Sequence, residues 1–166
     1  MPANPSKTEF LITRRFQQPL ARVWQAWSEA GQFQKWWGPK GCRIDLHRFE
    51  FRPGGFVHYA MNFPEGPAMW GRFAFREIAP RERVVWLNSF SNERCGIARA
   101  PFSEQCPLEI QNTVAFAEEG GATVITLRAL PFGELDEERA YFEALHPSLE
   151  QGYGGTLDAL AAHLLG

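Results

Sequence analysis

Apolar residues near the C-terminus recur at the three- and four-residue spacing of an α-helix. The positions that share this stripe are Tyr141, Leu145, Leu149, Gly152, Thr156, Leu160 and Leu164. The stripe predicts a long final helix with one face against the rest of the protein. Gly152, Gly154 and Gly155 interrupt its middle, and each glycine costs a helix about 1 kcal/mol relative to alanine. We therefore expect another element to approach the helix closely, and the missing side chains to leave space for a pocket.

The same pattern contains Pro147, which lacks a backbone donor and clashes with the preceding helical turn. We expect either a short helix that ends near Leu145 and a second helix from Pro147 onward, or a marked kink. His146 would lie at this junction. There it would either cap the helix or face a pocket mouth, where an imidazole can serve as an acid or base near neutral pH.

Seven earlier segments alternate between apolar and polar residues with the period of two that is typical of strands. They are 9–16, a run that begins at Cys42, 56–63, 69–78, 84–90, 109–118 and 122–130. Short Pro- and Gly-containing turns join most of them, such as 53–55 and 119–121. Connections this short require neighbouring strands to be antiparallel.

Three other segments depart from the strand pattern. A helix is predicted from Pro19 onward, and a second one over 31–35, where Gly38 and Pro39 end the pattern. The segment 92–107 is long and irregular, and it is either a lid or entrance to a pocket or a simple insertion. Together the elements predict an α+β fold in one domain over residues 1–166. A curved antiparallel sheet of six to seven strands wraps around the long C-terminal helix, with two short helices after the first strand.

Composition narrows the class of partner. Lys and Arg are scattered and the formal net charge is -2, which argues against nucleic-acid binding. No apolar run approaches the roughly 20 residues of a membrane-spanning helix, and the chain starts without an apolar leader, so we expect a cytoplasmic protein without a membrane partner. Aromatic residues reach 14%, a high share that indicates a large core or contact with a ligand.

Inward-facing aromatic positions on the strands, together with the glycine-rich part of the helix, form the candidate wall of a cavity for a small apolar molecule. The candidates are Trp37, Phe49, Tyr59, Met61, Phe73, Phe75, Trp86, Asn88, Phe90, Tyr153 and Leu157. Each aromatic side chain would either line a cavity or fill the core, because burial stabilises a ring in both places. Asn88 needs a hydrogen-bond partner, which would be either a ligand or the neighbouring backbone.

Catalytic and metal-binding patterns are missing from the sequence. The four histidines have neither mutual helical spacing nor a cysteine at ligand spacing, so no metal and no organic cofactor is expected. His58 should face solvent, because Tyr59 beside it is assigned to the inner face. The three cysteines are interpreted as reduced structural thiols. The serines offer no G-x-S-x-G motif, and no residue is named as catalytic.

The order of these segments resembles the START-like (SRPBCC, helix-grip) superfamily, and within it the branch of homologues of the activator of the heat-shock protein 90 ATPase. The residues that carry the likeness span nearly the whole chain. They are Phe16, Pro19, Val23 and Trp24, then 36–39, Glu50 with 52–55, Gly71, Glu77, Ile78, Pro80, Thr113, Val114, Phe116, Gly152, Tyr153, Leu157 and Leu160.

The resemblance implies a sheet curled around the last helix with a cavity that binds lipids, hormones or polyketides in relatives. Three functions are therefore carried forward. The leading one is binding of a small hydrophobic molecule. The alternatives are a cyclase- or hydrolase-type enzyme that uses the same cavity, with His146, Asn88 or Tyr59 moving protons, and a chaperone-interacting module. A homodimer through the sheet edge or the long loop is left open.

Overall fold

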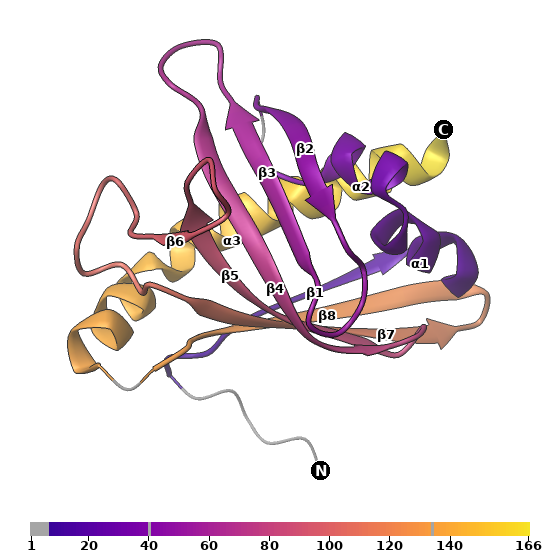
Figure 1. The fold of residues 1–166 in the computed structure, drawn as a ribbon. Coiled ribbons are helices and arrows are strands. Elements are labelled where there is room, and N and C mark those ends of the chain that lie inside the picture. Colours follow the sequence, from indigo (N-terminus) through magenta and orange to yellow (C-terminus); the bar gives the residue numbers. More distant parts are fainter. Residues whose placement is uncertain (1–6, 40, 134) are drawn as a thin grey trace.

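The structure is a computed structural model that describes residues 7–39, 41–133 and 135–166. Figure 1 shows a strongly curved sheet with one long helix running across its concave side. The elements follow in the order β1 (Phe10–Phe16), α1 (Leu20–Ser28), α2 (Ala30–Trp36), β2 (Arg43–Phe49), β3 (Phe56–Asn62), β4 (Met69–Ala79), β5 (Arg83–Ser91), β6 (Ile97–Ala98), β7 (Ile110–Glu119), β8 (Ala122–Pro131) and α3 (Asp136–Leu165).

The sheet is antiparallel throughout, with the order β1-β8-β7-β5-β4-β3-β2. These seven strands correspond to the seven alternating segments of the sequence. The eighth, β6, lies in the irregular segment 92–107 and pairs only with the end of β5. The predicted α+β helix-grip fold is confirmed, with one short strand more than expected.

Two bulges help to bend the sheet. The pairing of β2 with β3 shifts between Leu46 and Arg48, so His47 is an extra residue on β2. The pairing of β4 with β5 shifts between Phe75 and Glu77, which makes Arg76 the extra residue on β4. An extra residue bends its strand and increases the local twist. Both bulges therefore favour the concave face that receives α3.

The two short helices fill one end of the groove between the sheet and α3 (Figure 1). Their apolar face supplies Trp27 from α1 and Phe33 and Trp36 from α2, all at most 2% exposed. The indole N–H of Trp36 donates to the carbonyl oxygen of Ala26 at 3.0 Å, which fixes α2 against α1. Large aromatic side chains at this end occupy the space that would otherwise extend the groove.

The predicted division of the last helix at Pro147 is wrong, because α3 is assigned as one helix from Asp136 to Leu165. Residues just before the proline are held by the rest of the protein. Phe142 is fully buried, and the Nε2 atom of His146 lies 2.9 Å from the carbonyl oxygen of Thr8. Pro147 itself is exposed. Tertiary packing therefore carries the helix past a residue that local preference would use to end it.

The three glycines of α3 differ in their surroundings. A Cβ atom at Gly154 would lie 3.2 Å from the Nη2 atom of Arg14 on β1, so the expected close approach occurs there. A Cβ atom at Gly152 or Gly155 would meet nothing within 4 Å outside the adjoining helix. The expectation of close contact is therefore wrong for these two positions, which leave open space instead.

The prediction that His58 faces solvent is also wrong, because its side chain is buried on the outer side of the sheet and the residue is only 5% exposed. The ring stacks on Trp70 with centroids 4.9 Å apart, and Nε2 lies 2.8 Å from the carbonyl oxygen of Asn92. The connection that follows β5 thus covers this part of the outer face. Burial is the main cause that lowers the pKa of His58.

Candidate functional site

A cavity of about 280 Å³ lies between the concave face of the sheet and the middle of α3. The side formed by α3 consists of Leu145, Ser148, Leu149, Gly152, Tyr153 and Thr156. The strands β3, β4 and β5 contribute Tyr59, Met61, Gly71, Asn88, Ser89 and Phe90. The remaining wall comes from the turn after α2, the segment after β6 and the start of β7: Trp37, Gly38, Pro39, Phe102, Cys106 and Ile110.

Six of the candidate ligand contacts lie on this wall. They are Trp37, Tyr59, Met61, Asn88, Phe90 and Tyr153. The other five, Phe49, Phe73, Phe75, Trp86 and Leu157, belong to the core or pack against it and are not part of the wall. The helix α2 and the turn after it explain the difference. Phe73 contacts Phe33 and Trp37 at centroid distances of 5.8 and 5.0 Å, so side chains from α2 and this turn fill the groove in front of it.

Tyr59 owes its position to Gly71 on the neighbouring strand. The two residues are paired in the register of β3 and β4, and a Cβ atom at Gly71 would lie only 2.6 Å from the Tyr59 hydroxyl oxygen. The missing side chain therefore allows the ring to lie over β4. Burial raises the pKa of Tyr59 to about 12, against the opposing effect of a hydrogen bond with the Trp37 side chain. The phenol is consequently neutral near pH 7.

Tyr153 is held by Asn112, which sequence reasoning missed. Its hydroxyl donates to the Oδ1 atom of Asn112 at 2.7 Å, and its ring stacks on Phe10 with centroids 5.6 Å apart. Asn112 is fully buried on β7, and burial raises the pKa of Tyr153. The available signal was a polar residue at an inward position between Ile110 and Val114.

Thr156 joins α3 to the turn that follows α2. Its hydroxyl oxygen lies 3.0 Å from the carbonyl oxygen of Gly38 and 3.1 Å from that of Gly152. Gly38 adopts φ +106°, a conformation that a residue with a side chain rarely takes. The turn that carries Trp37 is thereby fixed against the helix.

Asn88 reaches the wall without a hydrogen-bond partner for its side chain among the residues that the structure describes. The neighbouring backbone, which was one of the two expected partners, is used only for strand pairing with Phe73 and Ile110. Within the same described residues, the wall has no side chain of Asp, Glu, Lys, Arg or His. The cavity is thus apolar and uncharged there, with a small number of neutral polar groups.

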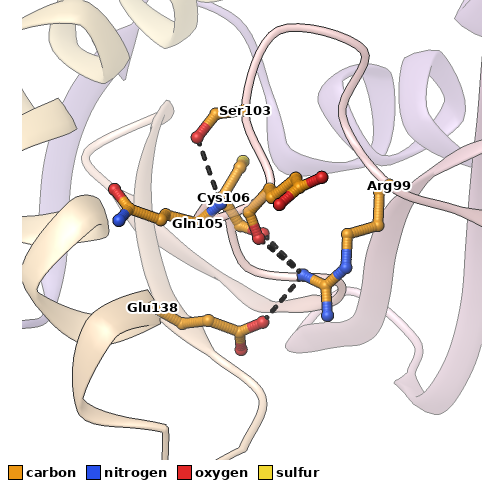
Figure 2. Close-up of polar contacts among 6 residues, drawn as sticks. Arg99, Ser103, Gln105, Cys106 and Glu138 are labelled. Carbon is orange, nitrogen blue, oxygen red and sulfur yellow. Dashed lines mark hydrogen bonds and ion pairs between the residues drawn. The ribbon is translucent and has the colours of Figure 1, made fainter.

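Arg99 anchors the segment 99–107, which follows β6 and closes one side of the cavity. Figure 2 shows its guanidinium between this segment and α3. The Nη1 atom lies 3.2 Å from the carbonyl oxygens of Glu104 and Cys106 and 3.1 Å from the Oε2 atom of Glu138. Within the segment, the backbone N–H of Gln105 donates to the Ser103 hydroxyl at 3.1 Å (Figure 2). Glu138 is 6% exposed.

The same segment contributes Phe102 and Cys106 to the wall. Phe102 is 60% exposed and packs edge-on against Phe90 with centroids 5.6 Å apart. Of the two interpretations of the segment 92–107, this position favours that of a lid or entrance. A residue that is half in solvent and half on a cavity wall lies at an opening.

Among the residues that the structure describes, histidines and other metal-ligating side chains do not gather at the cavity. His146 bonds to Thr8 and packs against Phe10 and Phe142, and it is not one of the wall residues. In the described ranges, no group of three or more His, Cys, Asp or Glu side chains is placed to hold a metal ion. None of the helices formed by these residues is long and apolar enough to cross a membrane.

Several solved structures of bacterial proteins have a similar fold. The solution structure of a protein from Arthrobacter aurescens superposes with a TM-score of 0.80 at 23% identity, over 98% of this chain and 90% of that one. A crystal structure of the Nitrosomonas europaea protein NE0264 gives a TM-score of 0.76 at 22% identity, over 99% and 98% of the two chains. At these identities the likeness concerns the fold alone.

A third similar structure is the AHSA1 protein from Silicibacter pomeroyi, with a TM-score of 0.72 at 19% identity over 95% of this chain and 97% of that one. A comparison with curated proteins finds no match. The family model described as "Activator of Hsp90 ATPase homolog 1-like protein" matches residues 17–165. Since this match covers nearly the whole fold, the chain belongs to the family of Activator of Hsp90 ATPase homolog 1-like proteins.

Proposed function

We propose that this protein binds a small, largely apolar molecule in the cavity between the sheet and α3. The observation that carries the proposal is the preformed cavity of about 280 Å³ with its apolar wall. Ligand pockets typically have volumes of about 300–1,000 Å³, mostly apolar walls and a few placed polar groups. This cavity matches that description at its lower limit, which favours a small ligand with two or three rings.

The energetics support such a ligand. Burial of about 200 Å² of apolar surface would contribute about 5 kcal/mol. The wall is already ordered, because Tyr153 is fixed by Asn112 and the Trp37 turn is fixed by Thr156. A preformed wall reduces the entropy lost when the ligand binds.

Two glycines of α3 provide a matched pair of variants for the test. Gly152 and Gly155 lie on the same helix with open space around the Cβ position, but only Gly152 lines the cavity. Gly152→Leu should therefore fill the cavity, whereas Gly155→Leu should leave it empty. The neutral fluorescent probe N-phenyl-1-naphthylamine should bind the wild type and Gly155→Leu with one equivalent, and should bind Gly152→Leu at least tenfold more weakly.

Two results would contradict the proposal: no saturable binding of the probe to the wild type, or equal binding to both leucine variants. Mass spectrometry of an organic extract of the purified protein complements the titration. A co-purified apolar molecule that is recovered with Gly155→Leu and lost with Gly152→Leu would name the natural ligand class.

The alternatives have less support. The titratable groups of the described wall are the phenols of Tyr59 and Tyr153 and the thiol of Cys106, and burial raises the pKa of all three. Such groups stay protonated near pH 7 and cannot act as general bases. The family description refers to the Hsp90 ATPase, and a pull-down with that chaperone tests the interaction role.

A further inference from the structure

We infer that the cavity selects an uncharged ligand with a hydrogen-bond acceptor, such as a ketone or ether oxygen, and that Tyr59 is the residue that donates to it. This inference rests on the proposed binding function and specifies the chemistry of the ligand. It makes Tyr59 a specificity-determining residue, with Asn88 as a second polar contact. Three observations on the described part of the chain carry it.

The first observation is that the proton of the Tyr59 hydroxyl has no acceptor. A phenol donates one hydrogen bond and accepts others. The hydrogen-bond partner of the Tyr59 hydroxyl is the Trp37 side chain, and an indole N–H can only donate. No further hydrogen bond of this hydroxyl occurs among the described residues. The residue is 4% exposed and lies on the cavity wall.

The second observation is the contrast with Tyr153 on the same wall. Its hydroxyl proton is used by the Oδ1 atom of Asn112 at 2.7 Å. Both phenols are buried, but only that of Tyr59 is left to donate into the cavity. The hydroxyl proton of Tyr153 is therefore paired within the protein, whereas that of Tyr59 is available to a ligand. An apolar ligand that covers this hydroxyl would leave its proton unpaired, which is unfavourable, so a ligand oxygen that accepts the proton is favoured over an apolar group.

The third observation is the charge of the wall. No Asp, Glu, Lys, Arg or His side chain lines it among the described residues. A carboxylate or ammonium group would lose its hydration without gaining a counter-ion. The amide of Asn88 can instead donate to and accept from a neutral ligand. Tyr59 and Asn88 come from β3 and β5, on either side of β4, where Gly71 pairs with Tyr59 and Phe73 pairs with Asn88.

The test compares three probes that share a naphthalene ring system and differ in the substituent at position 2. These are 2-acetonaphthone, which carries a ketone oxygen, 2-isopropylnaphthalene, which has a methyl group in its place, and the 2-naphthoate anion. Affinities are measured by displacement of N-phenyl-1-naphthylamine from the wild type, Tyr59→Phe and the control Tyr141→Phe, which removes a phenol that does not line the cavity. The ratio of ketone to hydrocarbon affinity removes the general effect of apolar burial. It should fall about fivefold in Tyr59→Phe, as expected for one lost hydrogen bond, and stay unchanged in Tyr141→Phe.

The outcomes separate the two proposals. If none of the neutral probes binds the wild type, the proposed binding function fails. If both neutral probes bind and Tyr59→Phe leaves the ratio unchanged, the binding function stands and the role of Tyr59 is overturned. Binding of 2-naphthoate as tight as that of the ketone would overturn the selection for an uncharged ligand. This last comparison needs only the wild type, so it decides even if a variant does not fold.

Discussion

The Nη1 atom of Arg99 lies 3.1 Å from the Oε2 atom of Glu138, and this ion pair joins the segment after β6 to the first turns of α3. The Glu138 side chain is 8% exposed and that of Arg99 is 46% exposed. Because Arg99 also bonds to the carbonyl oxygens of Glu104 and Cys106, one guanidinium joins the backbone of the segment to the helix.

Arg99→Ala should therefore release this segment. The variant leaves the Glu138 carboxylate buried without its cation, so we expect a loss of about 1–3 kcal/mol in the free energy of unfolding. Amide hydrogen exchange of 99–107 should become faster than in the wild type. Arg83→Ala is the control, because it breaks the exposed Arg83–Glu77 pair, which should contribute less than about 1 kcal/mol. Equal effects of the two variants would refute the anchoring role.

The helix glycines give a second prediction. Gly155→Ala should raise the free energy of unfolding by up to about 1 kcal/mol, because alanine favours the helix and the Cβ position is free. Gly154→Ala should gain less, because Arg14 must move from a distance of 3.2 Å. Urea unfolding of both variants measures the difference. If the free energy of unfolding rises as much in Gly154→Ala as in Gly155→Ala, displacing the Arg14 side chain costs no stability.

Gly71→Ala should destabilise the protein and displace the Tyr59 ring in the cavity wall. Its Cβ atom would lie 2.6 Å from the Tyr59 hydroxyl, so the ring must shift within a packed wall at a cost of about 1–3 kcal/mol. Gly31→Ala is the matched control, because it lies in α2 with nothing within 4 Å of the Cβ position, and it should stabilise the protein. Thermal unfolding distinguishes the two. A stable Gly71→Ala variant with unchanged probe affinity would contradict the role of this glycine.

His58 should make stability depend on pH. Its pKa is lowered in the folded protein, mainly by burial, so below its ordinary pKa of about 6.5 the unfolded chain binds a proton that the folded protein does not. Stability attributed to His58 is therefore present above about pH 6.5 and decreases as the pH falls towards the folded pKa. His163 contributes in the same direction, so replacing His58 removes only part of the effect.

The measurement is urea unfolding of the wild type and His58→Gln at pH 7.5 and 5.5. The wild type should lose more stability between these values than the variant does. The lowered pKa values of Glu50 and Glu77 arise from their arginine partners, and these carboxylates affect stability only in a more acidic range. An identical decrease in both proteins would show that His58 does not carry the effect.

The sequence predicted which residues face the concave side of the sheet, but not how far along each strand the cavity extends. Alternation gave the same inward direction to Tyr59 and Phe73, which are both buried. Only Tyr59 lines the cavity, because Phe33 and Trp37 cover Phe73. Where the cavity ends thus depends on packing between elements that are distant in sequence.

Local sequence patterns also could not predict polar partners that are far apart in the sequence. Asn112 and Tyr153 are separated by 41 positions, and Arg99 and Glu138 by 39. Burial of His58 was missed because the alternation rule assumes that one face of the sheet is solvated, whereas the Asn92 connection covers that face.

The bulge at His47 has a consequence for how these molecules behave at high concentration. β2 ends the sheet, with β3 as its single strand neighbour among the described residues, and an unpaired strand edge is a template for aggregation. The extra residue breaks the regular spacing of backbone groups along this edge, and Arg43, Asp45 and Arg48 add charge to it. The irregularity that helps the sheet to curve thus also hinders neighbouring molecules from stacking into fibrils.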